Sequence, residues 1–132
     1  MNVTSTIPIV TTTRLAATRA FYVDLLGFEP TFENEHYLGV RAGGPGSPEL
    51  GFMHPDAMAP DVFDGRGLSL VLNVPDADRE YGRLFAKGAP VKAPPQDMPW
   101  GSRCFSLLDP NGVVLVIAHP IPMALEFQAF VR

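Results

Sequence analysis

The residues best suited to chemistry lie in the stretch DMPWGSRCFSLLDPNGVVLVIAHP, residues 97–120. Trp100 stands before a glycine, Arg103 and Phe105 follow on a strand-like run, and DPNG at residues 109–112 has the composition of a tight turn. An indole ring can stack on a planar ligand, and a guanidinium can hold a carboxylate or a phosphate. The stretch therefore predicts a hairpin that forms one wall of a ligand site.

Glu49 is the second candidate, because a carboxylate held in an apolar pocket can act as a general base. Three interpretations of Glu49 stay open: an ion pair with Arg103, an exposed charge at a strand end, or a group that contacts a ligand or takes part in catalysis. Cys104 is the only cysteine, so one chain cannot form a disulfide or a thiolate zinc site. We interpret Cys104 as a core thiol beside Ile117.

The overall composition excludes several classes of partner. The net charge is -4 at neutral pH, whereas nucleic acids and anionic membrane surfaces are bound by clusters of Lys and Arg. No run of apolar residues reaches the roughly 18 that a membrane helix needs, and the N-terminus lacks the pattern of a signal peptide. We therefore expect a soluble, cytoplasmic protein that binds neither nucleic acid nor membrane.

The order of predicted elements occurs twice in the chain. A strand near the N-terminus, a helix that ends at Gly27 and three short strands are followed by a strand from Leu68, a helix between Asp76 and Gly88, and three more strands. This repeat predicts an α+β protein of two tandem βαβββ modules. Its parts are a module at 5–55, a linker at 56–66, a module at 67–120 and a tail at 121–132.

Two motifs point to a known family. RAFYVDLLGF at residues 19–28 and WGSRCFSLLDPNG at 100–112 resemble the vicinal oxygen chelate superfamily, which includes glyoxalases, extradiol dioxygenases and bleomycin-resistance proteins. The resemblance covers residues 5–120. It implies that the two modules form a single domain with a cupped mixed sheet, that the concave face of this sheet is the site, and that the protein is a homodimer.

The resemblance also implies where a metal would bind. Enzymes of this family hold a divalent ion with four side chains, and the corresponding positions here are Ile7, Glu49, Ser69 and Val116. Only Glu49 is a competent ligand, and a single carboxylate does not hold a divalent ion at a catalytic site. We therefore predict neither a metal nor another cofactor. We interpret the histidines that precede prolines at two strand ends, His54 and His119, as structural.

Alternation of side chains along the strands separates the two faces of the sheet. If DPNG forms a tight turn that pairs Asp109 with Gly112, Arg103 and Phe105 lie on the concave face, whereas Tyr37 stays unassigned. The concave face is apolar with scattered polar groups, as in binding cavities. The predicted ligand-binding residues are Ile7, Ile9, Glu49, Met53, Ser69, Val71, Trp100, Arg103, Phe105 and Val116.

These residues favour a metal-independent protein that sequesters a small apolar or aromatic molecule, as bleomycin-resistance proteins do. The acidic charge would suit a cationic antibiotic, although Arg103 in the cup argues against one. A second hypothesis is a metal-free lyase or isomerase with Glu49 as the base, and Arg103 or Ser69 stabilising negative charge. A third is a divalent-metal enzyme with an atypical ligand set, and a fourth is a purely structural role.

Overall fold

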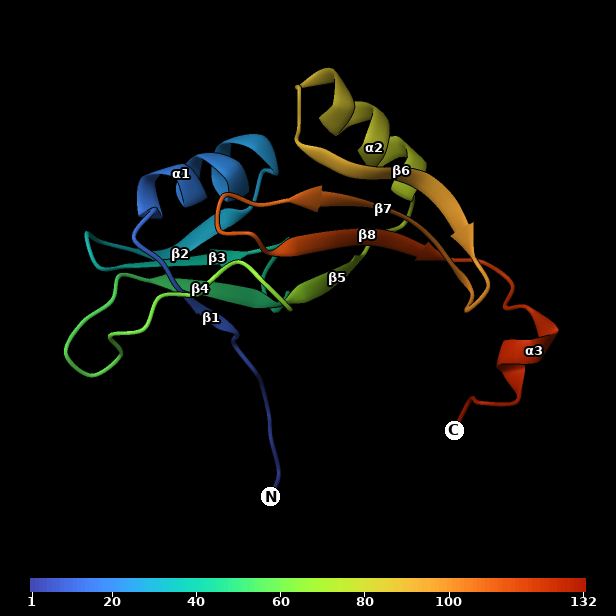
Figure 1. The fold of residues 1–132 in the computed structure, drawn as a ribbon, viewed down its shortest axis with the longest axis horizontal. Coiled ribbons are helices and arrows are strands. Elements are labelled where there is room, and N and C mark those ends of the chain that lie inside the picture. The colour runs from blue at the N-terminus through green and yellow to red at the C-terminus, as the bar shows by residue number, and fades with distance from the viewer. The chain divides into compact units, whose positions relative to one another are not determined.

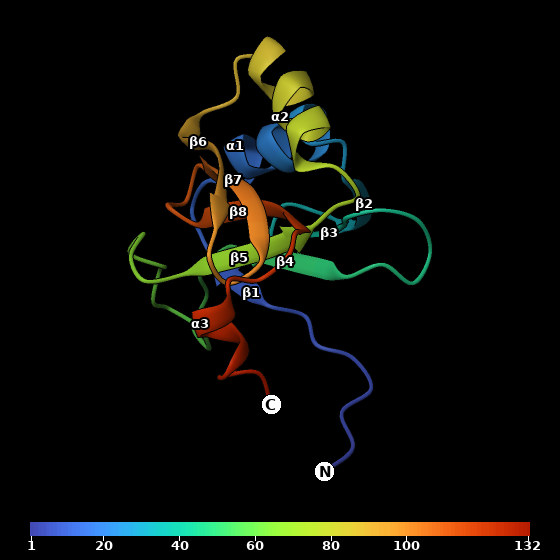
Figure 2. The same cartoon turned by 90° about the vertical axis from the view of Figure 1, so that its right-hand side faces the viewer.

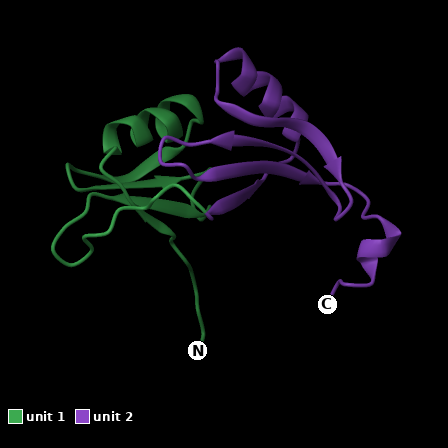
Figure 3. Cartoon of the chain, viewed as in Figure 1, with its two compact units in different colours: residues 1–66 green, residues 67–132 purple.

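The computed structural model describes residues 1–132, which divide into two compact units, 1–66 and 67–132 (Figure 3). Each unit has the same order of elements, so the predicted α+β class and the tandem βαβββ modules are confirmed. Unit 1 contains β1 (Ile9–Thr11), α1 (Leu15–Arg19), η1 (Ala20–Leu25), β2 (Glu29–Glu33), β3 (Tyr37–Arg41) and β4 (Glu49–Met53). Unit 2 contains β5 (Ser69–Asn73), α2 (Ala77–Ala86), β6 (Val91–Met98), β7 (Ser102–Leu108), β8 (Val114–Pro120) and α3 (Leu125–Gln128).

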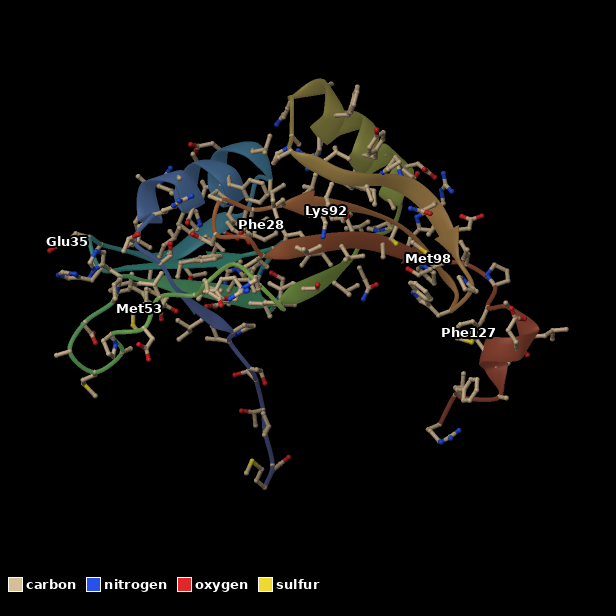
Figure 4. The ribbon with its side chains drawn as sticks, in the orientation of Figure 1. Phe28, Glu35, Met53, Lys92, Met98 and Phe127 are labelled. Carbon is tan, nitrogen blue, oxygen red and sulfur yellow. The ribbon has the colours of Figure 1, made fainter.

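The four strands of unit 1 form one mixed sheet in the order β1-β4-β3-β2, with β1 parallel to β4 and the other pairs antiparallel. The helical segment α1 and η1 covers one face of this sheet (Figure 1). The core lies between them, where the fully buried ring of Tyr22 contacts Phe52 with ring centroids 4.7 Å apart. Phe28 packs on the same tyrosine at 5.7 Å (Figure 4).

The helical segment of unit 1 changes its winding at Ala20. From there the backbone is a π-helix, in which the N–H of Leu26 donates to the carbonyl of Phe21, five residues back, at 3.0 Å. The wider turn places two sequence neighbours, Phe21 and Tyr22, in the core together. Gly27, with φ +81°, then ends the helix as the sequence predicts.

Unit 2 has a sheet of the same form, in the order β5-β8-β7-β6, with β5 parallel to β8 and α2 over one face (Figure 1). The predicted N-cap is confirmed, because the Asp76 carboxylate accepts from the N–H of Arg79 at 3.1 Å. His119 on β8 contributes a second cap, since its Nδ1 accepts from the N–H of Ala77 at 2.8 Å. Two side chains therefore satisfy two of the free N–H groups in the first turn of α2, those of Ala77 and Arg79.

The turn between β7 and β8 is one residue longer than the sequence predicts. The Asp109 carboxylate accepts from the N–H groups of Asn111 and Val113, each at 2.8 Å, and the Asp109 N–H donates to the Val113 carbonyl at 2.9 Å. The turn thus closes on Val113 rather than on Gly112. The first pair of the ladder beyond it is Leu108 with Val114.

Compared with the predicted register, this longer turn moves every β7 side chain to the opposite face of the sheet, because side chains alternate along a strand. Phe105 pairs with Ile117 and is only 1 % exposed, with its ring edge-on to Tyr81 of α2 at 5.3 Å. Cys104 is buried opposite Ala118 instead of beside Ile117. The predicted positions of Phe105 on the concave face and of Cys104 beside Ile117 are therefore wrong, although Cys104 is buried as predicted.

The two ends of the chain lie outside the sheets. Residues 1–8 have no regular structure and extend away from β1 (Figure 2). The tail is tied to the turn between β6 and β7, because Ile121 donates to the Gly101 carbonyl at 3.0 Å and Ala124 to the Pro99 carbonyl at 2.9 Å. None of the helices has the length and apolar character required to cross a bilayer.

Candidate functional site

The face of each sheet that its helix leaves uncovered is here called the open face. In unit 1 the register places Ile9, Gly51, Gly39 and Phe32 in one row across the four strands. Ile9 is 53 % and Phe32 57 % exposed. Met53 lies on the side of the sheet away from α1 (Figure 4). The predicted residues Ile9 and Met53 thus both lie on the open face of unit 1.

Tyr37 is the residue of this face that sequence alternation leaves unassigned. A Cβ added to Gly51 would overlap the Tyr37 hydroxyl and lie 2.9 Å from its Cζ, and one added to Gly39 would lie 3.3 Å from its Cε1. The ring therefore lies across two glycines that face each other in register. Phe32 meets the ring edge-on, with centroids 5.9 Å apart. The sequence signal for this ring was the glycine at the centre of both YLGVR and ELGFM.

Glu49 supplies the negative charge of the same face. The Thr31 hydroxyl donates to its Oε2 at 3.4 Å, and Arg41, opposite Glu49 in register, pairs with Glu29 at 3.2 Å instead. Burial, and secondly the charge of Glu49, raise the pKa of Tyr37 above its ordinary value of 10.0. At neutral pH the face therefore presents a protonated phenol beside a carboxylate without a cationic partner.

A hollow of about 400 Å³ adjoins Glu49 at the end of β4. The only charged residue in its lining is Glu49, and the predicted site residue Ile7 lies in the same wall. The hollow is formed by Ser5, Thr6, Ile7, Gly46, Ser47, Pro48 and Glu49. The structure thus brings four of the predicted residues, Ile7, Ile9, Glu49 and Met53, to one side of unit 1.

The open face of unit 2 contains three other predicted residues. Ser69 and Val71 are exposed on β5, and Val116 lies opposite Val71 and Ser106 in the register. Trp100 lies in the turn after β6, 52 % exposed, and its ring lies edge-on to that of Phe127 in the tail, with ring centroids 6.4 Å apart. Its ring therefore packs in part against the tail, and a ligand contact by Trp100 stays a prediction.

Arg103 does not lie on an open face. Its Nε donates to both carboxylate oxygens of Asp78, at 3.0 and 2.9 Å, and its Nη1 donates to Asp97 at 2.9 Å. Asp78 belongs to α2, so the guanidinium lies on the helix-covered side of β7. The predicted place of Arg103 on the concave face is therefore wrong, because the longer turn at Asp109 shifts the register of β7 by one residue. Of the three interpretations of Glu49, the ion pair with Arg103 is not formed, since Arg103 pairs with Asp78 and Asp97.

The ion pair between Arg103 and Asp78 predicts an effect of acid on stability. Hydrogen bonding to Arg103 holds the pKa of Asp78 below its ordinary value of 3.8. A carboxyl whose pKa is lowered by folding stabilises the fold above its unfolded pKa, and this stabilisation is lost as the pH falls through the folded pKa. Arg103→Gln should therefore lower Tm most at neutral pH, with a difference from wild type that shrinks below about pH 4.

Thermal unfolding of both proteins at a series of pH values measures this difference. Arg66→Gln is the matched control, because Arg66 forms a single exposed ion pair with Asp64. It should leave Tm nearly unchanged at every pH. A Tm difference for Arg103→Gln that is the same at pH 3 and pH 7 would contradict the assignment.

The side chains at the family's metal positions do not fit a divalent ion. Ile7 and Val116 have no donor atom, the Ser69 hydroxyl is a weak ligand, and only Glu49 supplies a carboxylate. No three His, Cys, Asp or Glu side chains lie close enough to hold an ion together. His119 uses its Nδ1 to accept from the N–H of Ala77. The donors at the positions that the resemblance implies thus do not fit a divalent ion, and metal independence stays a prediction.

Comparisons with known proteins agree with this architecture. The solved structures that resemble the chain include a glyoxalase/bleomycin resistance protein/dioxygenase from Nocardioides, with a TM-score of 0.77 and 23 % identity over 92 % of this chain and 85 % of that one. TnmS3, an antibiotic binding protein from a Streptomyces species, has a TM-score of 0.70 and 26 % identity over 90 % and 97 %. A superfamily member from Sphaerobacter thermophilus has a TM-score of 0.62 and 28 % identity over 90 % and 97 %.

No protein with a curated description matches the sequence. The model of one protein family matches residues 5–117, and its description reads Glyoxalase/Bleomycin resistance protein/Dioxygenase superfamily. This match spans both βαβββ units and includes the two motifs in the first helix and the last hairpin. The chain therefore belongs to the glyoxalase/bleomycin resistance protein/dioxygenase superfamily.

Proposed function

We propose that the protein binds a small apolar or aromatic molecule without a metal and sequesters it, as a homodimer. The observation that carries the proposal is the open face of unit 1, where Tyr37 lies flat over two glycines between the exposed side chains of Ile9 and Phe32. Exposed apolar side chains that lie together in one patch are a feature of ligand-binding and interaction surfaces. The similarity to TnmS3, an antibiotic binding protein, supports the same function.

The face is suited to binding because it is formed before a ligand arrives. The strand that carries Tyr37 packs through Leu38 and Val40, both buried, on the helix-covered side. The phenol ring is supported by backbone on one side and by Phe32 on its edge. A ligand that stacks on a fixed ring loses little free energy to ordering the protein, so a modest contact area gives useful affinity.

One observation favours an enzyme as the second candidate. Glu49 is a carboxylate without a cationic partner, and the nearby Tyr37 phenol keeps its proton at neutral pH. An acceptor and a donor on one face could remove a proton and return it, which is the requirement of a metal-free lyase or isomerase. In this case Glu49→Gln should abolish turnover.

The two candidates are separated by a screen of planar aromatic compounds for thermal stabilisation, with mass analysis of every compound that stabilises the protein. A binder holds its ligand unchanged, and a ligand at a hundred times its Kd adds about 2.7 kcal/mol to the free energy of unfolding. Tyr37→Ala should weaken binding at least tenfold. Phe85→Ala is the control, because it removes an aromatic ring that is 62 % exposed on α2.

Two results would overturn the proposal. Stabilisation by none of the compounds would mean that the open face does not bind small aromatic molecules. If a bound compound is converted to a product, and if Glu49→Gln abolishes this conversion, the protein is an enzyme instead. A decrease in affinity for Tyr37→Ala, no change for Phe85→Ala and full recovery of the compound would support the binding protein.

A further inference from the structure

We propose that the open face of unit 1 recognises a flat aromatic group that bears a protonated amine, with Glu49 as the anion that holds the nitrogen. This inference rests on the proposed function, since it names the ligand class of the same face. Its basis is the juxtaposition of an unneutralised carboxylate, a half-buried phenol and a hollow without any other charge.

The first step is the charge of Glu49. Its only hydrogen bond within the chain comes from the Thr31 hydroxyl, at the long distance of 3.4 Å, and it takes part in no ion pair. The neighbouring arginine on β3, Arg41, is held by Glu29 at 3.2 Å. In the same unit Arg19 is bound by Asp24 and Glu33. The carboxylate of Glu49 is therefore available to a cation from outside the chain.

The second step is the space around Glu49. The hollow of about 400 Å³ beside Glu49 is lined otherwise by uncharged residues only, namely Ser5, Thr6, Ile7, Gly46, Ser47 and Pro48. Tyr37 lies over Gly51, which is on the same face of β4 as Glu49, and it is close enough for the charge of Glu49 to influence its phenol. An amine in the hollow would meet Glu49 while its aromatic group lies against Tyr37 and Ile9.

The third step is the position of Arg103. A guanidinium in the site would repel a protonated amine, and the predicted register placed Arg103 there. In the structure Arg103 is bound to Asp78 and Asp97 on the helix-covered side of unit 2. On the open face of unit 1 itself, the arginine opposite Glu49, Arg41, is paired with Glu29.

Three probes with the same ring test the proposal: naphthylmethylamine, which is protonated at neutral pH, naphthylmethanol, which is neutral, and naphthoate, which is an anion. Affinities and contact sites are measured by titration of the isotope-labelled protein with NMR detection. We expect the amine to bind about tenfold more tightly than the alcohol, and naphthoate most weakly, because a charge-assisted hydrogen bond exceeds a neutral one. The chemical shifts of Thr31, Tyr37 and Gly51 should respond.

Glu49→Gln should reduce the affinity for naphthylmethylamine to that for naphthylmethanol. The affinity for naphthylmethanol should stay unchanged. Glu35→Gln is the matched control, since it removes the same charge from an exposed carboxylate at the turn between β2 and β3 (Figure 4). This control should leave all three affinities unchanged. Added salt should weaken the binding of the amine and not the binding of the alcohol.

The outcomes separate this inference from the proposed function. If the amine and the alcohol bind equally at Tyr37, or if Glu49→Gln has no effect, the amine subsite is overturned and the binding function stands. Chemical-shift changes confined to residues of unit 2 would likewise overturn the amine subsite alone. If none of the three probes binds, both the subsite and the aromatic-binding function are overturned.

Discussion

Phe105→Ala should destabilise the protein by about 3–5 kcal/mol, the usual cost of truncating a buried phenylalanine. The side chain is 1 % exposed, pairs with Ile117 and meets Tyr81 edge-on at 5.3 Å. Its removal would leave a cavity between α2 and the sheet of unit 2. Since globular proteins are stable by about 5–15 kcal/mol, this is a large share of the total. Urea unfolding followed by circular dichroism measures it.

The same variant tests the register of the last hairpin. Had the turn closed on Gly112, Phe105 would lie on the open face, and its loss would weaken ligand binding with little change in stability. Val116→Ala is the comparison, because Val116 lies on the open face of β8. It should cost about 1 kcal/mol or less, as expected for a partly exposed position. Equal stability losses for the two variants would contradict the observed register.

Gly51→Ala should abolish most aromatic binding while leaving the free energy of unfolding within about 1 kcal/mol of wild type. The new methyl group would overlap the Tyr37 hydroxyl and lie 3.1 Å from Ile9 Cγ1, so the ring must leave its place over the glycines. A tyrosine hydroxyl is the free end of a side chain and can move at low cost. Alanine in a strand also restricts the unfolded chain, which offsets part of that cost.

Naphthylmethanol affinity, compared with urea unfolding of the same samples, separates the two effects of Gly51→Ala. We expect affinity to fall at least tenfold. Gly44→Ala is the matched control, because a Cβ at Gly44 meets no atom within 4 Å and should change neither quantity. Wild-type affinity in Gly51→Ala would show that the position of the Tyr37 ring does not matter for binding.

The fold could be predicted because its signals are local. Turn residues, a capping aspartate at Asp76 and glycines at the helix ends determine the order of elements in both units. The alternation of side chains along the strands predicted the correct face of the sheet for four residues, because the face of each was assigned without the turn at Asp109. These residues are Ile9, Met53, Ser69 and Val71. The same holds for Val116 and the side chains of β8, whose faces follow from its parallel pairing with β5.

The errors arose where a side chain, rather than the backbone pattern, decides the geometry. Asp109 accepts two backbone hydrogen bonds and so lengthens the turn by one residue, which exchanged the faces of Arg103 and Phe105. DPNG has the same composition for either turn length, so the sequence could not distinguish them. Tyr37 could not be placed because its position depends on two glycines that meet only when β3 and β4 pair.

The glycine pair also bears on how many ligands one chain can hold. The row in unit 1 contains Ile9, Gly51 and Gly39, whereas a row across the same three strands of unit 2, β5, β8 and β7, contains Val71, Val116 and Ser106. Side chains there fill the space that the glycines leave open to a ring. The same strand order thus occurs in both units, and only in unit 1 do two facing glycines leave room for a flat ring. We therefore expect a binding stoichiometry of one aromatic group per chain, so that a dimer would hold two.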